Sequence, residues 1–276
     1  MSVLEIDNLS FSYRKDEPLL QNVSVSFQKG DIFCLLGPNG SGKTTLISQI
    51  LFPSKENRDR IKVNRTSVSQ MSLSERAKRF GYVPQKIPFP HISVIQTVIM
   101  GRYPHKRNPF LKVDAKDQRL AEEALKQLGL THHANRQLYT LSGGEVQRVF
   151  IAQSIAKQAE IYFFDEPMSA LDPEYQAIFL DLISWLSERN ATIIFTTHNP
   201  NHVFSLNKKT RVGILGKNHV FQEVAIDTQH GIEAIEKAYN GAVSISYLAQ
   251  EDQYVARFNT RRAHEASLAR TPLKTK

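Results

Sequence analysis

The stretch GPNGSGKTT, residues 37–45, constrains the fold more than any other part of the chain. Through Gly37, Gly42, Lys43 and Thr44 it satisfies the pattern G-x-x-x-x-G-K-[ST], and it lies between the apolar run IFCLL and the helical pattern TTLISQILF. Small residues in such a loop let consecutive backbone N–H groups turn toward phosphates, and the amino end of the helix adds positive potential. We therefore expect a phosphate-binding loop in which Lys43 reaches the β and γ phosphates and Thr44 binds Mg²⁺.

Two other apolar runs end in side chains that suit the same chemistry. IYFFDE delivers Asp165 to a strand end, where a carboxylate can join the Mg²⁺ shell, and places Glu166 where it can polarise an attacking water. TIIFTTH ends in His198, which can hydrogen-bond the γ phosphate or the Glu166 side chain. Because the carboxyl ends of parallel strands meet at one edge of a sheet, we expect these groups beside Lys43. The alternatives are a solvated strand end for the carboxylates, a surface position for His198, and a metal pair of His198 with His202, which lacks a nearby Glu or Cys to complete a ligand set.

The stretch LSGGEVQR, residues 141–148, resembles a second phosphate-binding loop because glycines and a hydroxyl lead into a helical pattern. The preceding ANRQLYT is not a convincing buried strand, and the stretch has no lysine. It can therefore offer N–H groups and Ser142 to a phosphate, but it cannot form a second complete site.

The pattern of apolar residues predicts an α/β fold with an inserted helical subdomain. Residues 2–36 show the alternation of short strands, and the α/β alternation that resumes at EIYFFDE implies a mostly parallel sheet. Between them, SVIQTVIMG, DQRLAEEALKQLG and GGEVQRVFIAQSIAKQ predict at least three helices. The fold class is thus a P-loop NTPase core, with an N-terminal antiparallel β part beside the mostly parallel sheet. We predict an ATPase domain over residues 1–245, with the helical subdomain at about 88–158, and a C-terminal extension over 246–276.

Composition describes an ordinary globular protein and leaves the class of partner open. With 276 residues, 41% of them hydrophobic, the chain can bury a core, and no apolar stretch reaches the roughly 18 residues of a membrane span. The N-terminus lacks the pattern of a secretory signal, and the single cysteine, Cys34, is predicted to be buried in a strand. The net charge of +8 is spread out, except that six Lys or Arg accompany one Glu in residues 257–276. We expect a solvated tail there, with a contact to lipid headgroups or to a partner as the alternative.

Taken together, these motifs resemble those of the nucleotide-binding subunits of ABC transporters. GPNGSGKT is similar to Walker A, YFFDE to Walker B and LSGGEVQR to the family signature. GYVPQ with Gln85 resembles the Q-loop, SALD with Asp172 the D-loop, and TTH with His198 the switch histidine. Tyr13 matches the aromatic residue that stacks on adenine. The resemblance covers residues from about 4 to 225.

The resemblance implies an ATPase that uses ATP and Mg²⁺. The catalytic residues would be Glu166, His198 and Gln85, and Mg²⁺ would be held by Thr44, Gln85 and Asp165. ATP would be bound by Tyr13, Gly37, Pro38, Asn39, Gly40, Ser41, Gly42, Lys43, Thr44, Thr45, Ser142, Gly143, Gly144 and Asp172. Two copies would close head to tail over two ATPs, and the signature of each copy would serve the ATP of the other.

Simpler explanations stay open for three of these residues, and three positions depart from the family pattern. Tyr13 could pack in the core, Gln85 could only cap a strand, and Asp172, which precedes a proline, could be a helix N-cap. Glu145 and Met168 replace a commoner Gln and Thr, and VNRTS lacks the glycine usual in its hairpin turn. None of these departures removes a catalytic group.

The stretch MGRYPH, residues 100–105, followed later by FTTHNPNHV, is similar to ATPases of bacterial importers for iron-siderophores, haem and cobalamin, and to related molybdate importers. The resemblance implies a homodimer at the cytoplasmic face of the inner membrane, without nucleic acid. It would bind permease subunits through residues 86–105 and work indirectly with a periplasmic or lipoprotein solute-binding protein. The alternatives are a molybdate-type or other importer and, from a different class, a soluble ABC ATPase of translation or DNA maintenance. That class usually carries two cassettes or a long coiled coil, whereas this chain has one cassette, in which Ser142 lies only 105 positions after Gly37.

Overall fold

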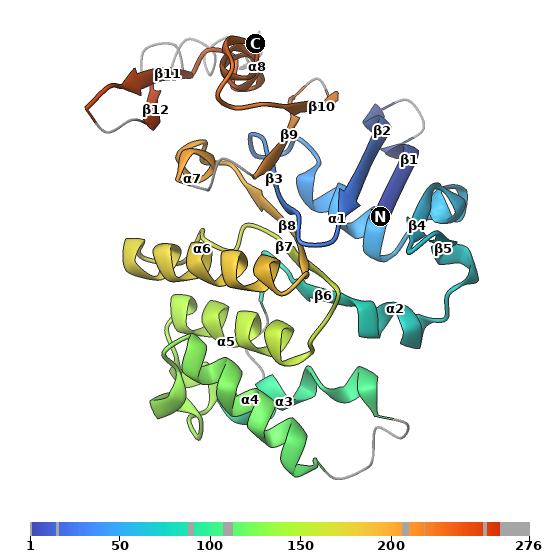
Figure 1. Ribbon diagram of the computed structural model, residues 1–276, viewed down its shortest axis with the longest axis vertical. Coiled ribbons are helices and arrows are strands. Elements are labelled where there is room, and N and C mark those ends of the chain that lie inside the picture. Colours follow the sequence, from blue (N-terminus) through green and yellow to red (C-terminus); the bar gives the residue numbers. More distant parts are fainter. Residues whose placement is uncertain are drawn as a thin grey trace, which may run out of the picture. The chain divides into compact units, whose positions relative to one another are not determined.

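The computed structural model describes residues 2–14, 17–87, 91–106, 113–205, 210–217, 219–250 and 253–259, which fall into two compact units (Figure 1). Unit 1 takes its described residues from Met1–Asn8, Ser24–Ile32 and Thr44–Thr196, and unit 2 from Leu9–Val23, Phe33–Lys43 and Thr197–Lys276. Residues 260–276, which hold most of the predicted basic tail, lie outside the described residues.

Unit 1 is built on the parallel strands β6 (Phe80–Val83), β7 (Ile161–Phe164) and β8 (Thr192–Thr197). Every residue of β7 and β8 is buried, as expected for parallel strands that are covered on both faces. Phe179 of helix α6 (Pro173–Glu188) lies against Phe164 and the β8 residue Phe195, with ring centroids 5.3 and 6.2 Å away. These aromatic contacts fix α6 on one face of the strands.

The helices of unit 1 lie where the apolar periodicity predicts them. Helices α3, α4 and α5 pack on one another and are drawn in green in Figure 1. They correspond to the three helices expected in the inserted subdomain. The predicted bounds of that subdomain, about 88–158, and of the C-terminal extension, 246–276, stay predictions. Apart from α6, the helical elements of unit 1 are α1 (Lys43–Leu51), η1 (Lys55–Arg60), η2 (Val68–Gln70), α2 (Leu73–Arg79), α3 (Val94–Met100), η3 (Tyr103–His105), α4 (Ala115–Gln127), η4 (Thr131–His133), η5 (Leu138–Thr140) and α5 (Gly143–Ala156).

The N-terminal β part is an antiparallel sheet whose first two strands are longer than the short strands predicted from sequence. Strands β1 (Ser2–Arg14) and β2 (Glu17–Gln28) run through both units. Asn8 and Asn22 take left-handed conformations, with φ of 54° and 49°, and their N–H groups donate to the Oγ atoms of serines on the facing strand. Because the serine side chains accept these bonds, both strands continue past the left-handed residues.

The sheet continues into a small hairpin that explains one departure from the family pattern. Strand β4 (Ile61–Val63) pairs with β1 and is joined to β5 (Thr66–Ser67) by a two-residue turn. Asn64 and Arg65 in this turn have φ of 46° and 69°. The turn is therefore closed by two left-handed residues, which is the backbone that a tight hairpin needs, without a glycine.

Unit 2 combines the strand before the phosphate-binding loop with the C-terminal part of the chain. Strand β3 (Ile32–Leu36) runs parallel to β9 (Arg211–Leu215), and β9 pairs antiparallel with β10 (Phe221–Val224). Cys34 of β3 is fully buried, and burial raises the pKa of its thiol well above the ordinary value, so it is a packing residue. The other elements of unit 2 are α7 (Asn201–Phe204), α8 (Gln229–Ala238), β11 (Val243–Leu248) and β12 (Gln253–Phe258).

Candidate functional site

The phosphate-binding loop connects β3 to α1 as predicted. The Lys43 side chain is buried, and its Nζ donates to the carbonyl oxygens of Gly37 at 2.8 Å and Pro38 at 3.2 Å. Gly42 has a φ of +107°, which residues with a side chain rarely adopt, so the turn into α1 requires glycine here. Asn39, Gly40 and Thr44 are exposed. The loop therefore holds the buried Lys43 ammonium group on two of its own carbonyl oxygens and exposes Asn39 and Gly40 to solvent.

Two hydroxyl side chains of the loop are also buried, and one contact of the loop was not predicted. Ser41 and Thr45 are buried, and the Ser41 Oγ has no hydrogen-bond partner among the described residues. The Nδ1 of His219 lies 3.3 Å from the Ser41 carbonyl oxygen and must be the protonated nitrogen of the ring to donate to it. No sequence pattern marks His219, because the contact joins two loops that are 178 residues apart.

Asp165 and Glu166 follow β7 and are locked by a threonine of β8. The Thr196 hydroxyl donates to Asp165 Oδ1 at 2.7 Å and accepts the N–H of Glu166 at 2.8 Å. Asp165 is fully buried, and its second oxygen, Oδ2, has no hydrogen-bond partner among the described residues. A buried carboxylate with one unsatisfied oxygen is costly unless a cation or a donor binds it. Thr196 was not identified from the sequence as a site residue. The signal that could have found it is its place in the same strand pattern, two residues before His198.

Glu166 is held in a strained backbone conformation and its side chain is bound by Gln85. Its φ is 48°, and its carbonyl oxygen accepts from the Ser169 hydroxyl at 2.9 Å. Gln85, which follows β6, donates from Nε2 to Glu166 Oε2 at 3.0 Å. Left-handed residues other than glycine are uncommon and concentrate at functional sites, where neighbouring bonds over-determine them. Gln85 is thus bound to the candidate catalytic carboxylate rather than merely capping its strand.

The signature stretch begins a helix and does not follow a strand, as predicted. Ser142 is the N-cap of α5, and it forms a capping box with Glu145 in which Ser142 N–H donates to Glu145 Oε2 at 2.8 Å. This bond holds the pKa of Glu145 below its usual range, and burial opposes it in part. The Glu that replaces the commoner Gln therefore places a full negative charge at the positive end of α5.

Gly144 is required by a close approach within unit 1. A Cβ at this position would lie 2.8 Å from the carbonyl oxygen of Ala170, in the stretch SALD. At Gly143, a Cβ would meet nothing within 4 Å. The second glycine of the signature is thus needed for packing, whereas the first leaves the surface beside Ser142 open.

Asp172 caps a helix, and Tyr13 lies at the surface. Asp172 is the N-cap of α6, with its side chain accepting the Tyr175 N–H at 3.0 Å and Pro173 in the first turn. The predicted N-cap is therefore present, and it leaves one carboxylate oxygen for another contact. Tyr13 is 74% exposed and touches Phe11 edge to face, so it is not a core residue.

His198 is exposed, and the loop after β8 is ordered by a network around a neutral histidine. His202 Nδ1 lies 2.8 Å from the Thr197 Oγ1, and Asn199 Nδ2 lies 3.4 Å from His202 Nε2. Burial, with a smaller effect of His198, lowers the pKa of His202 to about 4. With Nδ1–H donating to Thr197 and Nε2 accepting from Asn199, both ring nitrogens are used. His202 is therefore not available for a metal pair, and the described residues contain no group of three metal-ligating side chains.

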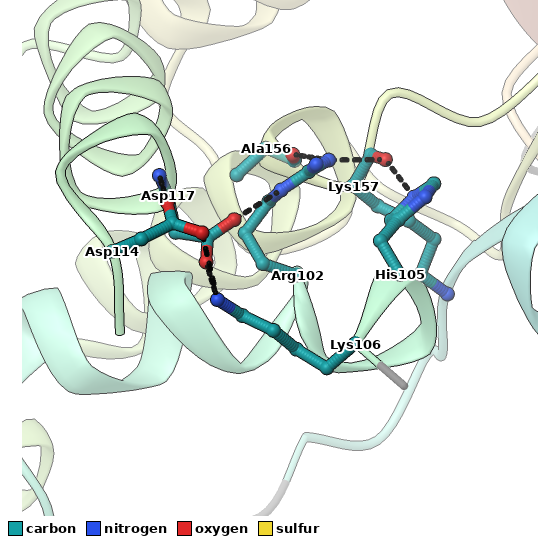
Figure 2. Close-up of polar contacts among 7 residues, drawn as sticks. All are labelled: Arg102, His105, Lys106, Asp114, Asp117, Ala156 and Lys157. Carbon is teal, nitrogen blue, oxygen red and sulfur yellow. Dashed lines mark hydrogen bonds and ion pairs between the residues drawn. The ribbon is translucent and has the colours of Figure 1, made fainter. Parts of the chain in front are cut away.

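A buried cluster fixes the stretch RYPHK to the carboxyl end of α5 (Figure 2). Arg102 Nε donates to Asp117 Oδ1 at 3.1 Å, and the two side chains are only 6% and 5% exposed. Figure 2 shows the Arg102 guanidinium between Asp117 and the carbonyl oxygens of Ala156 and Lys157, to which Nη1 donates at 3.0 and 2.9 Å. Arg102 thus joins the end of α3 to α4 and α5.

The cluster extends to the two residues after the proline. Lys106 binds Asp114 at 3.0 Å and also pairs with Asp117, and these carboxylates raise the pKa of its ammonium group. His105 Nε2 donates to the Lys157 carbonyl oxygen at 2.8 Å. Burial, aided by the nearby Arg102, lowers the pKa of His105, which favours the neutral ring. The stretch is therefore attached to both α4 and α5 by buried polar contacts.

Comparison with known proteins decides the family. The family model described as ABC transporter matches residues 20–169, more than half of the chain. The chain belongs to the ABC transporter family. As a member of this family it is an ATPase with the P-loop NTPase fold. In the part of the chain that the structure describes, no helix is long and apolar enough to cross a membrane.

Curated ABC relatives and one solved ABC structure resemble most of the chain. The molybdate import ATP-binding protein MolC of Haemophilus influenzae is 38% identical over 210 residues, 75% of this chain and 77% of MolC. The manganese transport system ATP-binding protein MntB of Bacillus subtilis is 35% identical, over 72% of this chain and 78% of MntB. The iron(3+)-hydroxamate import ATP-binding protein FhuC of Bacillus subtilis is 32% identical, over 73% and 75% of the two chains. A solved inward-facing structure, described as an ABC transporter of the metal-chelate type, has a TM-score of 0.78 and 30% identity, over 95% of this chain and 99% of that one.

Proposed function

We propose that this ABC ATPase is the ATP-hydrolysing subunit of a bacterial importer, in which dimer closure on ATP drives uptake through a permease. Tyr13 stacks on adenine, and the loop Gly37–Thr45 binds the phosphates. Lys43 exchanges its carbonyl acceptors for phosphate oxygens, because a buried ammonium gains more from an anion than from neutral acceptors. Glu166 orients and polarises the attacking water, with Gln85 and His198 beside it in the reaction.

The observation that carries this assignment is the way Glu166 is held. Its N–H donates to the Thr196 hydroxyl oxygen, its carbonyl oxygen accepts from Ser169, and its carboxylate accepts from Gln85. A side chain on a strained backbone with a bound carboxylate is pre-organised, so little rearrangement is needed in the reaction.

The side chains that follow the carboxyl end of β7 suit Mg²⁺ as the cofactor. Asp165 Oδ2 is buried without a partner among the described residues, the Thr44 hydroxyl is exposed, and Gln85 supplies an amide oxygen. Hard oxygen ligands of this kind are those that Mg²⁺ takes, and the ion would offset the charge of the phosphates. Asp165, Thr44 and Gln85 would hold it.

The signature supports a head-to-tail homodimer. Ser142 is exposed at the amino end of α5, and Gly143 keeps the surface beside it open. We propose that Ser142, Gly143, Gly144 and Asp172 complete the ATP site of a second copy. The two-fold arrangement makes each ATP a bridge between subunits.

The permease partner is proposed to bind residues 86–105, at the cytoplasmic face of the inner membrane. Tyr103 and Met100 are 41% and 42% exposed, while Arg102 between them is buried in the cluster of Figure 2. An exposed apolar pair on a rigid attachment suits a docking surface. A periplasmic or lipoprotein solute-binding protein would act indirectly, through the permease.

The cargo is proposed to be a metal chelate of the iron-siderophore, haem or cobalamin type. The metal-chelate type structure, which matches 95% of this chain, and FhuC support this class. The 38% identity to MolC favours molybdate as the second candidate, and manganese follows from MntB.

Two experiments test the proposal. The chain, tagged and recovered from solubilised membranes, should bring down an integral-membrane permease, whereas recovery with ribosomes or DNA and no permease would replace the importer by a soluble ABC ATPase. Uptake of a labelled ferric chelate, molybdate or manganese is then compared in cells with the wild-type chain and cells with Glu166→Gln. The labelled solute whose uptake is lost only in the variant identifies the cargo class.

A further inference from the structure

The backbone of His198 is held by a residue near the C-terminus of the chain. The Tyr239 hydroxyl donates to the His198 carbonyl oxygen at 2.6 Å. Tyr239 is the C-cap of α8, where its N–H donates to the carbonyl oxygens of Ile235 and Lys237. His198 is an exposed residue, and this bond restrains it through its main chain.

A second attachment lies three residues after His198. The Asn201 side chain donates from Nδ2 to the Ala256 carbonyl oxygen at 3.1 Å and accepts the Ala256 N–H at its Oδ1 at 2.8 Å. Both backbone groups of a β12 residue are thus paired by one side chain, as a neighbouring strand would pair them. Ala256 is only 5% exposed, which protects the two bonds from water.

The two attachments belong to one structure. Glu236 of α8 accepts the Ile245 N–H of β11 at 2.8 Å, and β11 pairs with β12 along its whole length. Phe204 of α7 lies against Tyr254 of β12, with centroids 5.9 Å apart. The α8 helix and the β11–β12 hairpin therefore form a brace that holds the backbone from residue 198 to residue 204.

We propose that this brace, made of α8, β11 and β12, sets the position of His198 for ATP turnover, with Tyr239 and Asn201 as positioning residues. The proposal rests on the role of His198 given under Proposed function. The brace lies beyond the stretch 20–169 that the family model matches.

We expect the Tyr239 hydrogen bond to affect the position of His198 more than the stability of the fold. Tyr239 is only partly buried, so a carbonyl that loses its hydroxyl partner can bind water at little cost to folding. Turnover, in contrast, depends on the placement of His198 to within a fraction of an ångström. Loss of one restraint should therefore change the rate more than the stability.

The test compares Tyr239→Phe with the wild-type full-length chain in steady-state ATP hydrolysis. We expect kcat to fall about 2- to 10-fold, the range that one hydrogen bond supplies, with KM for ATP and the melting temperature unchanged. Asn201→Ala should also lower kcat, and because it leaves the buried N–H and carbonyl groups of Ala256 without their partner, it should lower the melting temperature as well. Tyr254→Phe is the matched control, because it removes a hydroxyl from the same brace at a residue for which the structure gives ring contacts.

The decisive arm repeats Tyr239→Phe in a His198→Ala background. If Tyr239 acts through His198, the second change has no further effect on the residual kcat. An equal fall in both backgrounds, or wild-type kcat in both Tyr239→Phe and Asn201→Ala, overturns the brace proposal while leaving His198 in place. Wild-type turnover in His198→Ala alone would remove the role of His198, and the brace proposal with it.

Discussion

Gln85 Nε2 and Glu166 Oε2 lie 3.0 Å apart in a hydrogen bond that joins the residues following two neighbouring parallel strands. The bond links the stretch proposed to contact the permease, which begins one residue after Gln85, to the carboxylate proposed to activate water. A displacement of the Gln85 loop would therefore change the position of Glu166 directly.

Glu166→Gln should bind ATP but stop turning it over. An amide keeps the size of the side chain but cannot act as a base, so we expect kcat to fall by at least about 100-fold. ATP affinity, measured by equilibrium binding, should stay within a few-fold, and an ATP-bound dimer should accumulate in size-exclusion chromatography with ATP. Glu188→Gln, an exposed position at the end of α6, is the control. Hydrolysis at the wild-type rate in Glu166→Gln would show that another group activates the water.

Mixed dimers should show that each ATP site is shared between two chains. Lys43→Ala in one chain and Ser142→Arg in the other leave one composite site intact, so roughly half of the ATPase activity should remain. When one chain carries both changes and its partner is wild type, both composite sites are damaged, and activity should be lost. The reverse result would mean that each chain completes its own site.

Gly144→Ala should destabilise the fold, whereas Gly143→Ala should not. The new methyl group would lie 2.8 Å from the Ala170 carbonyl oxygen, and relief of such overpacking costs about 1–3 kcal/mol of the free energy of unfolding. At Gly143 nothing lies within 4 Å of the added carbon. Urea unfolding of the two variants measures the difference, and equal stabilities would contradict the close approach.

Arg102→Met should cost about 3 kcal/mol or more of folding stability, because it leaves Asp117 buried without its main partner. Lys106 still pairs with Asp117 and limits the loss. Arg102→Met with Asp117→Leu should recover part of it, since no buried charge is then unpaired. Arg119→Met, which breaks the exposed pair with Glu123, is the control and should cost at most about 1 kcal/mol. A small effect of Arg102→Met in chemical unfolding would show that the cluster does not stabilise the attachment.

Stability should fall as the pH is lowered from about 6.5 to about 4, in part through His202. Its pKa is about 4 in the folded chain and near the ordinary 6.5 when unfolded, so in this window the unfolded state binds the proton and the folded state does not. Above 6.5 the contribution is fully present, and below 4 no more is lost. The loss is at most about 3 kcal/mol, reduced by the partial exposure of the ring. His202→Gln should show a shallower decrease in urea unfolding between pH 7 and pH 4.5, and an unchanged slope would assign the pH dependence to other groups.

The amino-acid sequence by itself determined the family and the fold class, and it predicted which residues form the candidate site. A glycine loop after an apolar strand, and carboxylates after another, can be recognised locally, because loop conformation and strand ends depend on neighbouring residues. Because they too depend on neighbouring residues, two further features were predictable: no strand directly precedes the stretch LSGGEVQR, and Asp172 caps a helix.

Only the tertiary structure decided which groups meet. Gln85 and Glu166 are 81 residues apart, and Tyr239 and His198 are 41 apart, so no local pattern records either bond. The lengths of β1 and β2 depended on serines of the facing strand, which allow Asn8 and Asn22 to bend the backbone without ending it. Contacts of this kind arise from the packing of distant segments, and the side chains that make them carry no signal of their own in the chain.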